Sequence, residues 1–340
     1  MKKAFFLFLL LCAISFSAGA QTPVAPMPDS VKRFLDTVIN IFRNESLNRD
    51  SVNWDTVKKE VYHKAENAKN VKDMIPAVRY IFDQLHDNHG AILYKGIPYG
   101  AHKPRQQYSK ALMTQLSAAG AAKLKVQLLD NNYGYILVPS IQTSNTDDYS
   151  KYAQDIKDSI CRINSKKIKG WIIDLRLNPG GNMWPMLGGI GAIIGDGNVG
   201  SFINNKGEMQ QVWSVKNGDA YYDTTRLTST GSKCDIKSRK IAVLIGPITQ
   251  SSGEAIAISL KGRPNTLFFG ENTGGYTTAN LTHELSYHFS LNVASFIEAD
   301  RNKKAYRYLV EPDILIVGGD NFIDLSQDIK VIAALNWLKH

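Results

Sequence analysis

The sequence predicts an α/β protein in which a mixed sheet with crossover helices follows a small helical domain. Two observations lead to this prediction. From Tyr133 onward, short apolar runs typical of strands alternate with amphipathic runs typical of helices. Before residue 90, apolar residues recur at helical spacing instead. In such an α/β sheet, ligands collect at the carboxyl ends of the strands, so polar residues at those ends are candidate site residues.

The chain is expected to divide into four parts. Residues 1–20 are expected to be a signal peptide, residues 21–29 a Pro-rich disordered leader, residues 30–90 a helical domain and residues 91–340 the α/β domain. Helices are expected to begin near Ser30, Asp55 and Val71, and then at Tyr149–Ile163, Met183–Ile194, Ser252–Leu260 and Asp324–Leu338. The expected strands are Tyr135–Pro139, Gly170–Leu175, Ile241–Gly246, Thr266–Gly270 and Ile314–Val317. Segments Ser201–Tyr222 and Asn280–Val293 show β-type alternation and are expected to form hairpins that wall a cleft.

The N-terminus has the pattern of a targeting segment. Lys2-Lys3 precedes an apolar stretch from Ala4 to Phe16, and Ala18-Gly19-Ala20 is a cleavage site of the small-x-small type. The apolar stretch is too short to span a membrane. We therefore expect no membrane span, cleavage near Ala20 and a protein that is periplasmic or secreted.

Composition excludes some classes of function. Hydrophobic residues make up 44% of the 340 residues and charged residues 21%, which is ordinary for a soluble globular protein. The formal net charge is +9. No arginine-rich run or interleaving of basic and aromatic residues indicates nucleic-acid binding, so no nucleic-acid partner is expected. A mild attraction to anionic peptides or cell-envelope polymers is compatible with this charge.

Export would leave two cysteines, Cys161 and Cys234, in an oxidising compartment. Such a compartment permits a disulfide between them. Cys161 also falls on an expected helix face, where a free cysteine can serve as a small buried apolar residue. The sequence leaves both alternatives open.

Three polar segments lie where expected elements end: Thr249–Glu254, Asp174–Gly181 and Leu85–His89. A serine between a strand and a helix presents its hydroxyl at a helix N-terminus, where free N–H groups favour a developing negative charge. The same serine could instead cap the helix, with Glu254 completing a capping box. The glycine turn, taken alone, could bind phosphate, hold an oxyanion or be an ordinary loop.

The histidine segment could also indicate a metal site, since Asp87 lies between two histidines. However, no third strong ligand lies nearby, and the chain has no HExxH motif or paired CxxC spacing. We expect neither a metal nor a cofactor.

Together, these segments resemble the S41 peptidase family, which includes the C-terminal processing proteases, the tricorn core protease and the retinoid-binding-protein-like repeats. A family-type chain carries L-x-D-x-H, G-Y-I-x-x-P, D-L-R-x-N-x-G-G, T-x-S-x-x-E, G-x-x-T-G and V-x-P-D in this order. The matching segments here are Leu85–His89, Gly134–Pro139, Asp174–Gly181, Thr249–Glu254, Gly270–Gly274 and Val310–Asp313. The resemblance implies a core like that of ClpP and crotonase and a serine peptidase, a hydrolase that acts on peptides or unfolded proteins.

The resemblance is closer to the tricorn-like branch of the family. In the processing proteases a lysine after the G-x-x-T turn acts as the base, and a PDZ domain precedes the D-L-R strand. Here Tyr276 stands where that lysine would be expected, and too few residues separate His89 from Tyr133 for a PDZ domain. The tricorn-like branch uses the histidine of L-x-D-x-H, and a histidine suits proton transfer at neutral pH.

The resemblance then implies a role for each motif residue. Ser251 would be the nucleophile of an acyl-enzyme mechanism, and His89 would be the general base and then the general acid. The N–H of Ser252 and an N–H of Gly180 or Gly181 would hold the oxyanion. Glu254 is a candidate for a supporting role.

The residues expected to orient the histidine depart from the tricorn-like pattern. A carboxylate and a serine serve there, whereas this chain has Tyr306 and Asn88, neither of which is charged at neutral pH. Another acid such as Glu298 or Asp300 could substitute, or the enzyme could be slow. Alternatively, the chain could be an inactive relative that binds peptides or small apolar ligands. An esterase is a further alternative, and a homo-oligomer is left open.

Overall fold

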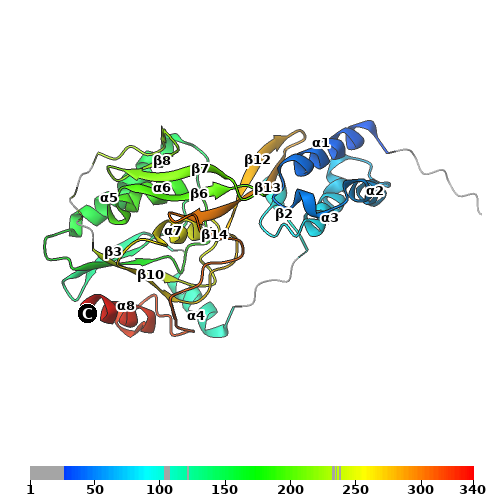
Figure 1. Ribbon diagram of the computed structural model, residues 1–340. Helices are drawn as coiled ribbons and strands as arrows, with labels where there is room; N and C mark the ends of the chain where they lie inside the picture. The colour runs from blue at the N-terminus through cyan, green and yellow to red at the C-terminus, as the bar shows by residue number, and fades with distance from the viewer. Residues whose placement is uncertain (1–26, 103–107, 121, 232–233, 235, 237–238) are drawn as a thin grey trace, which may run out of the picture.

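The computed structural model describes residues 27–102, 108–120, 122–231, 234, 236 and 239–340. The expected signal peptide and residues 21–26 of the expected leader lie outside the described residues. A helical region and a larger α/β region lie side by side, and the long strands β12 (Thr278–Leu285) and β13 (Phe289–Asp300) extend from one to the other (Figure 1). None of the helices in the described part of the chain is both long and apolar enough to cross a bilayer.

The helical region forms because its helices each have one apolar face. It contains α1 (Asp29–Glu45), α2 (Trp54–Lys64) and α3 (Ile75–Gln84), with 3₁₀ turns at Arg49–Ser51 and Val71–Met74. The apolar residues of α1 recur at helical spacing and are buried: Val31, Phe34, Leu35, Val38, Ile39 and Phe42. Phe42 meets Phe82 of α3 edge-on, and Phe34 meets Phe289 of β13 in the same way, at centroid distances of 4.9 and 5.0 Å. The helices therefore pack against the N-terminal end of β13, where Phe289 is the first residue.

A six-stranded sheet lies at the centre of the α/β region. Its strand order is β15 (Ile314–Leu315), β11 (Thr266–Gly270), β10 (Lys240–Ile245), β5 (Gly170–Asp174), β4 (Tyr133–Leu137) and β3 (Lys125–Leu129). All neighbouring pairs are parallel except β3 with β4. The connecting helices are α5 (Asp147–Ile163), α6 (Met183–Ile194) and α7 (Ser252–Leu260) on one face, and α8 (Ile329–Lys339) on the other. Both faces are covered, which explains why its central strands are continuously apolar.

A second sheet is antiparallel throughout. Its order is β2 (Ile97–Tyr99), β1 (Ala91–Tyr94), β13, β6 (Gly197–Ile203), β7 (Met209–Lys216), β8 (Asp219–Tyr222) and β9 (Thr225–Arg226). Strands β12 and β14 (Ala305–Tyr306) also pair with β13. Phe202 of β6 packs against Trp213 of β7 at 4.8 Å between centroids. The two segments expected to form hairpins thus belong to one sheet that is separate from the parallel one.

The predicted α/β class with an N-terminal helical region is confirmed, while some details differ. The polar segment with an ambiguous helical pattern near Ser109–Ala119 forms helix α4 (Lys110–Ala119). The last helix begins at Ile329 and not at Asp324. The reason is that Asp324 caps a separate 3₁₀ turn, Leu325–Gln327, whereas Asp328 accepts hydrogen bonds from the first N–H groups of α8.

A buried charge network fixes α8 to the parallel sheet. The guanidinium of Arg176 donates to Asp174, Asp320 and Asp328 at 2.6, 2.8 and 2.8 Å. Lys330 of α8 donates to Asp320 at 2.8 Å. A buried charge is stable only when it is paired, so each of these groups needs its partners to remain charged. The aspartate and arginine of the D-L-R motif therefore have a structural role, because they attach α8 to the sheet.

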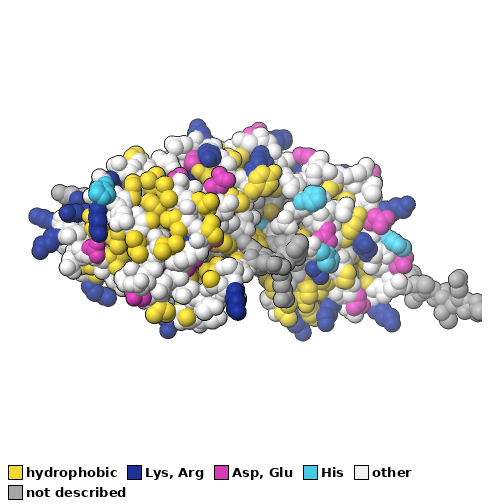
Figure 2. All heavy atoms as spheres, turned by 90° about the horizontal axis from the view of Figure 1, so that it is seen from below, with side chains coloured by type: hydrophobic (Ala, Val, Ile, Leu, Met, Phe, Trp, Pro, Cys, Tyr) yellow, Lys and Arg dark blue, Asp and Glu magenta, His cyan; other side chains and the backbone are white. Residues whose placement is uncertain are grey.

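The basic character of the chain is distributed over its surface. Figure 2 shows lysine and arginine side chains scattered over the visible face, while hydrophobic side chains gather on the α/β region. This distribution fits a general surface charge better than a single binding patch on this face.

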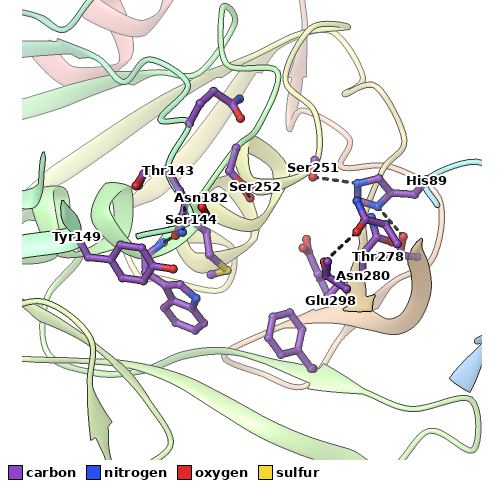
Figure 3. A pocket seen from close by; sticks show the side chains of 18 of the residues that line it. His89, Thr143, Ser144, Tyr149, Asn182, Ser251, Ser252, Thr278, Asn280 and Glu298 are labelled. Carbon is purple, nitrogen blue, oxygen red and sulfur yellow. Dashed lines mark hydrogen bonds between the residues drawn. The ribbon is translucent and has the colours of Figure 1, made fainter. Parts of the chain in front are cut away.

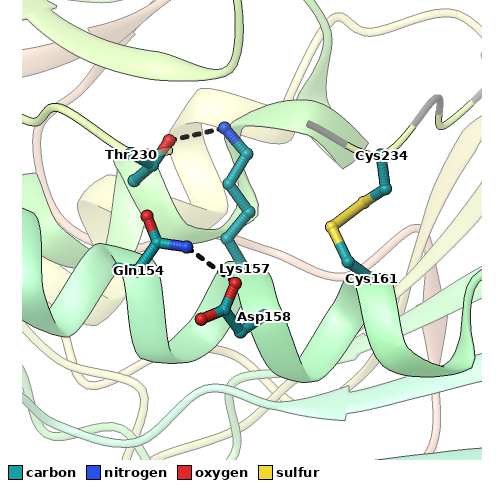
Figure 4. The surroundings of a disulfide bond; sticks show 6 residues. All are labelled: Gln154, Lys157, Asp158, Cys161, Thr230 and Cys234. Atoms are coloured by element: carbon teal, nitrogen blue, oxygen red, sulfur yellow. Dashed lines mark hydrogen bonds between the residues drawn. A yellow bond between two sulfur atoms is a disulfide. The ribbon is translucent and has the colours of Figure 1, made fainter. Parts of the chain in front are cut away.

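The two cysteines of the expected mature chain form a disulfide, which decides between the two alternatives. Cys161 near the end of α5 bonds to Cys234 with the Cα atoms 5.5 Å apart (Figure 4). One turn earlier on α5, the buried ammonium of Lys157 donates to Thr230 at 2.5 Å. The segment after β9 is therefore held to α5 at two successive turns.

We expect that replacing both cysteines by serine lowers the free energy of unfolding by up to about 4 kcal/mol. The disulfide joins residues 73 positions apart, and a cross-link of that span removes much of the chain entropy of the unfolded state. Urea unfolding of the variant and of wild type measures the loss. Wild type treated with a reductant is the control and should behave like the variant. Equal midpoints for oxidised wild type and the variant would contradict the prediction.

Candidate active site

Ser251 sits in a strained turn between β10 and α7. Its φ is 52° and its ψ is −122°, a region that residues with a side chain rarely adopt. The carboxylate of Glu254 accepts a hydrogen bond from the Ser251 N–H at 3.0 Å, which is the acidic half of a capping box. In this turn the serine hydroxyl lies within hydrogen-bond distance of the histidine segment.

The Ser251 hydroxyl forms a hydrogen bond with His89. Its Oγ lies 3.0 Å from Nε2, and Nδ1 of the same ring lies 2.9 Å from Oγ1 of Thr278 (Figure 3). The ring also packs edge-on against Tyr276, with 5.4 Å between centroids. If Nδ1 carries the proton and donates it to Thr278, Nε2 is left as the acceptor for the serine proton. This geometry is that of a nucleophile with its base.

Asp87 holds the histidine loop in place. Its buried carboxylate accepts from the N–H groups of His89 and Gly90 at 3.0 and 2.6 Å, and from that of Ala294 on β13 at 3.1 Å. A Cβ on Gly90 would lie only 2.5 Å from this carboxylate and 2.7 Å from the carbonyl oxygen of Asn292. The aspartate and the glycine around His89 therefore fix the histidine against the strand.

The glycine turn after β5 lies directly against the serine turn. The Ser252 hydroxyl donates to the carbonyl of Gly181 at 2.6 Å, and a Cβ on Gly180 would lie 2.8 Å from the Cβ of Ser251. Asn178 binds both turns, because its side-chain oxygen accepts from the Gly180 N–H and its carbonyl accepts from the Gln250 N–H, each at 3.0 Å. Only glycine allows this close approach.

The contact with Asn178 corrects one part of the predicted oxyanion site. The N–H of Gly180 is already donated to a side chain, so it is not available to a bound oxygen. The N–H groups of Gly181 and Ser252 have no acceptor among the described residues. These two groups flank Ser251 and are the donors that remain for a developing negative charge.

Glu254 connects the serine turn to the next loop. It is completely buried, and besides Ser251 it accepts from the N–H groups of Gly275 and Tyr276 at 2.9 and 2.7 Å and from the hydroxyl of Thr273. Burial raises the pKa of Glu254, although these hydrogen bonds oppose the rise. The supporting role expected for this residue thus has a structural basis, but it supports the backbone and not the imidazole.

Tyr306 does not orient His89, which corrects the prediction from motif spacing. Its hydroxyl donates to Asp300 at 3.0 Å, and its pKa is raised because the phenol is buried beside that carboxylate. Tyr306 lies on β14, whose pairing with β13 directs the ring toward the turn at Asp300. The position beside Nδ1 belongs to Thr278. Asn88 lines a smaller cavity of about 440 Å³, which His89 also lines.

The roles of Asp87 and Thr278 in this arrangement were not predicted from the sequence. Asp87 was part of the L-x-D-x-H motif, and its position two residues before His89 was a signal that could have indicated a loop clamp. Thr278 gave no such signal, because a threonine at the start of an alternating strand is common. Its contact with His89 joins residues 189 positions apart.

A cavity of about 990 Å³ opens beside Ser251 and His89. Glu298 of β13 lines it, although this side chain is only 3% exposed. Its Oε2 has no hydrogen-bond partner among the described residues. Burial raises the pKa of Glu298 well above its ordinary value, and the nearby Glu254 adds to the rise. Neither Glu298 nor Asp300 is hydrogen-bonded to His89 in the described part of the chain.

Comparison with known proteins identifies the family and the fold of this chain. The model of peptidase family S41 matches residues 132–316, and the chain belongs to that family. The chain is 28% identical over 306 residues to the nisin-resistance protein of Lactococcus lactis subsp. lactis, covering 90% of this chain and 89% of that protein.

Two solved structures share the fold. A lipoprotein from Streptococcus agalactiae superposes with a TM-score of 0.70 at 23% identity, over 92% of this chain and 97% of the other. The photosystem II D1 C-terminal processing protease superposes with a TM-score of 0.59 at 12% identity, over 88% and 96% of the two chains. The resemblance stated from the six motifs is thus confirmed at the level of family and fold.

We expect Glu298→Gln to change how stability depends on pH. In the unfolded chain this carboxyl ionises near its ordinary pKa of 4.5, whereas in the folded protein it keeps its proton to higher pH. Between these two values folding must take up a proton, so wild type loses up to about 1.4 kcal/mol per pH unit from this group as pH rises. The glutamine variant lacks that loss.

Urea unfolding of both proteins between pH 4 and 8 measures the effect. The difference in free energy of unfolding, variant minus wild type, should grow as pH rises above about 4.5. Glu284→Gln, which removes an exposed carboxylate from β12, is the control and should follow wild type. A difference that is constant over the whole range would show that Glu298 ionises normally in the folded protein.

Proposed function

We propose that this chain is an exported serine peptidase that cleaves peptides or unfolded proteins through Ser251 and His89. The observation that carries the proposal is the 3.0 Å hydrogen bond between Ser251 Oγ and His89 Nε2. The serine lies at a strained strand-to-helix turn and beside two N–H groups without an acceptor among the described residues. Export is proposed from the basic and apolar N-terminal segment and its small-x-small cleavage pattern.

The proposed reaction follows from these positions. His89 accepts the Ser251 proton as the hydroxyl oxygen attacks the peptide carbonyl carbon, and the carbonyl oxygen becomes an anion bound by the N–H groups of Gly181 and Ser252. His89 then gives the proton to the leaving amine as the peptide C–N bond breaks. A water molecule, activated by the same imidazole, hydrolyses the ester on Ser251 and restores the serine hydroxyl.

The partner of His89 limits the rate. Thr278 can fix the tautomer and the direction of the ring through its hydroxyl. However, a neutral hydroxyl stabilises the imidazolium less than a carboxylate does, and loss of the carboxylate's function in other triads costs about 10⁴ in rate. We propose a slow peptidase. A non-catalytic peptide-binding relative is the second candidate, because it would also tolerate a neutral partner.

The substrate class is proposed from the family and from one relative. The family whose model matches is a peptidase family, and the relative from Lactococcus lactis is named for resistance to nisin. Peptides short enough to enter the 990 Å³ cavity are therefore the proposed substrates, together with unfolded protein segments.

Labelling with a fluorophosphonate tests the nucleophile. The reagent should modify Ser251 in wild type, and Ser251→Ala should abolish both labelling and casein hydrolysis. Ser252→Ala is the matched control and should keep most of the activity, because the proposed role of this residue uses its backbone N–H. The reverse pattern for the two serines would overturn the assignment.

Substitution of Thr278 tests how the imidazole is held. Thr278→Val keeps the shape of the side chain but removes the hydroxyl, so kcat should fall about tenfold, the value of one hydrogen bond, with little change in KM. Thr278→Ser retains the hydroxyl and should keep most of kcat. Steady-state kinetics on a fluorogenic peptide provide the measurement. An undiminished kcat in the valine variant would mean that another group orients the ring.

A further inference from the structure

The cavity beside Ser251 has a distinctive chemical lining. Trp184 and Phe202 supply aromatic surface together with Tyr149, and Glu298 supplies a carboxyl group; Tyr149 and Glu298 are labelled in Figure 3. The described residues that line the cavity include no lysine, arginine or aspartate, and Glu298 is the one acidic side chain among them. His89 is at the edge where the reaction is proposed to take place.

Two buried acceptors adjoin this cavity without a donor. Oε2 of Glu298 and Oδ1 of Asn280 are both shielded from solvent and have no hydrogen-bond partner among the described residues. Both residues also line the cavity. Native proteins satisfy nearly all buried polar atoms, so unsatisfied ones in a cavity suggest that a ligand supplies the missing partner. Oδ1 of Asn280 is an acceptor, and Oε2 of Glu298 is one whenever the carboxyl is ionised, so a ligand that donates hydrogen bonds and favours the ionised carboxyl would satisfy both atoms.

The backbone holds Glu298 rigidly at this place. Its N–H donates to the carbonyl of Thr277 at 3.1 Å, and across the sheet it lies directly opposite Phe202 of β6. Side chains on opposite residues of neighbouring strands lie about 5 Å apart, so the carboxyl and the phenyl ring form adjoining parts of one wall. A rigid position favours selection of a ligand over accommodation of many.

A basic side chain matches all of these features. The ammonium of lysine or the guanidinium of arginine supplies several donors and a positive charge for the carboxyl, and both cations interact favourably with aromatic faces. The apolar stems of these side chains can lie along Phe202 and Met183, which also line the cavity. A neutral donor could also bind these oxygens, but it would not favour the ionised form of the carboxyl as a cation does.

We propose that this cavity is a specificity pocket in which Glu298 selects a lysine or arginine side chain next to the scissile bond. This inference rests on the proposed peptidase function. When the cation enters, the carboxyl of Glu298 releases its proton to solvent and forms an ion pair with it. The net charge of +9 does not contradict this selection. It affects the approach of a substrate from a distance, whereas inside the cavity a substrate side chain interacts with the charge of the lining residues.

Matched peptides test the selection. Two fluorogenic peptides are used, one with lysine directly before the scissile bond and one with lysine directly after it. Each has a counterpart with norleucine at the same position, and norleucine has a similar stem without the ammonium. Wild type should cleave the better lysine peptide with a kcat/KM at least tenfold above that of its counterpart. Glu298→Gln should reduce this ratio at least tenfold, mainly through KM, while Glu284→Gln, outside the cavity, should leave it unchanged.

Fluorophosphonate labelling of Ser251 separates failure of this inference from failure of the proposed function. Absence of both labelling and cleavage in wild type would overturn the peptidase function and the specificity proposal with it. Labelling together with cleavage that shows no preference for lysine would overturn the specificity proposal alone. A preference that persists in Glu298→Gln would do the same. Normal labelling of the glutamine variant would show that its serine turn is intact, so that a lost preference reflects the pocket.

Discussion

The geometry of the candidate site depends on the buried carboxylate of Glu254. It accepts the Ser251 N–H and so helps to hold the serine in its strained conformation, and it also binds the loop at Thr273, Gly275 and Tyr276. From that loop the chain enters β12, which carries Thr278. One buried group therefore fixes both the serine and the strand whose threonine holds His89. Removing it would leave several donors unsatisfied at once, which is costlier than losing any single hydrogen bond.

Local patterns could be predicted from the sequence, whereas contacts between distant segments could not. The turn before α7, the glycines after β5 and the histidine after α3 each had a local signature of residue types. Thr278 had none, because its role comes from strand pairing that brings it to His89. Tyr306 was predicted from motif spacing, but the register of β14 on β13 sends its hydroxyl to Asp300. Similarly, alternation predicted the strands of β6 to β8 and β12 to β13, but it could not assign them to a separate sheet.

A neutral partner for His89 changes what must accelerate the proposed reaction. Thr278 can orient the ring but adds no negative charge near the imidazolium that forms during attack. More of the acceleration must then come from placing the scissile bond against Ser251, which requires binding energy from substrate groups away from the reacting atoms. A cavity with a buried carboxyl beside the serine is a source of such energy, since an ion pair formed there is shielded from water.

Glu254 and Glu298 illustrate how environment separates the roles of two buried carboxyls. Glu254 is surrounded by donors, and its charge can be satisfied within the protein. Glu298 has a buried oxygen without a donor among the described residues, and burial raises its pKa well above the ordinary value. A carboxyl in that position destabilises the fold at neutral pH, and a glutamine would avoid the cost of protonation. Such a local conflict between stability and sequence is typical of functional sites. Burial of this carboxyl without a donor weakens the fold, and it also favours a cation that can supply the missing charge and hydrogen bonds. The loss of stability and the gain in selectivity would therefore have one physical origin.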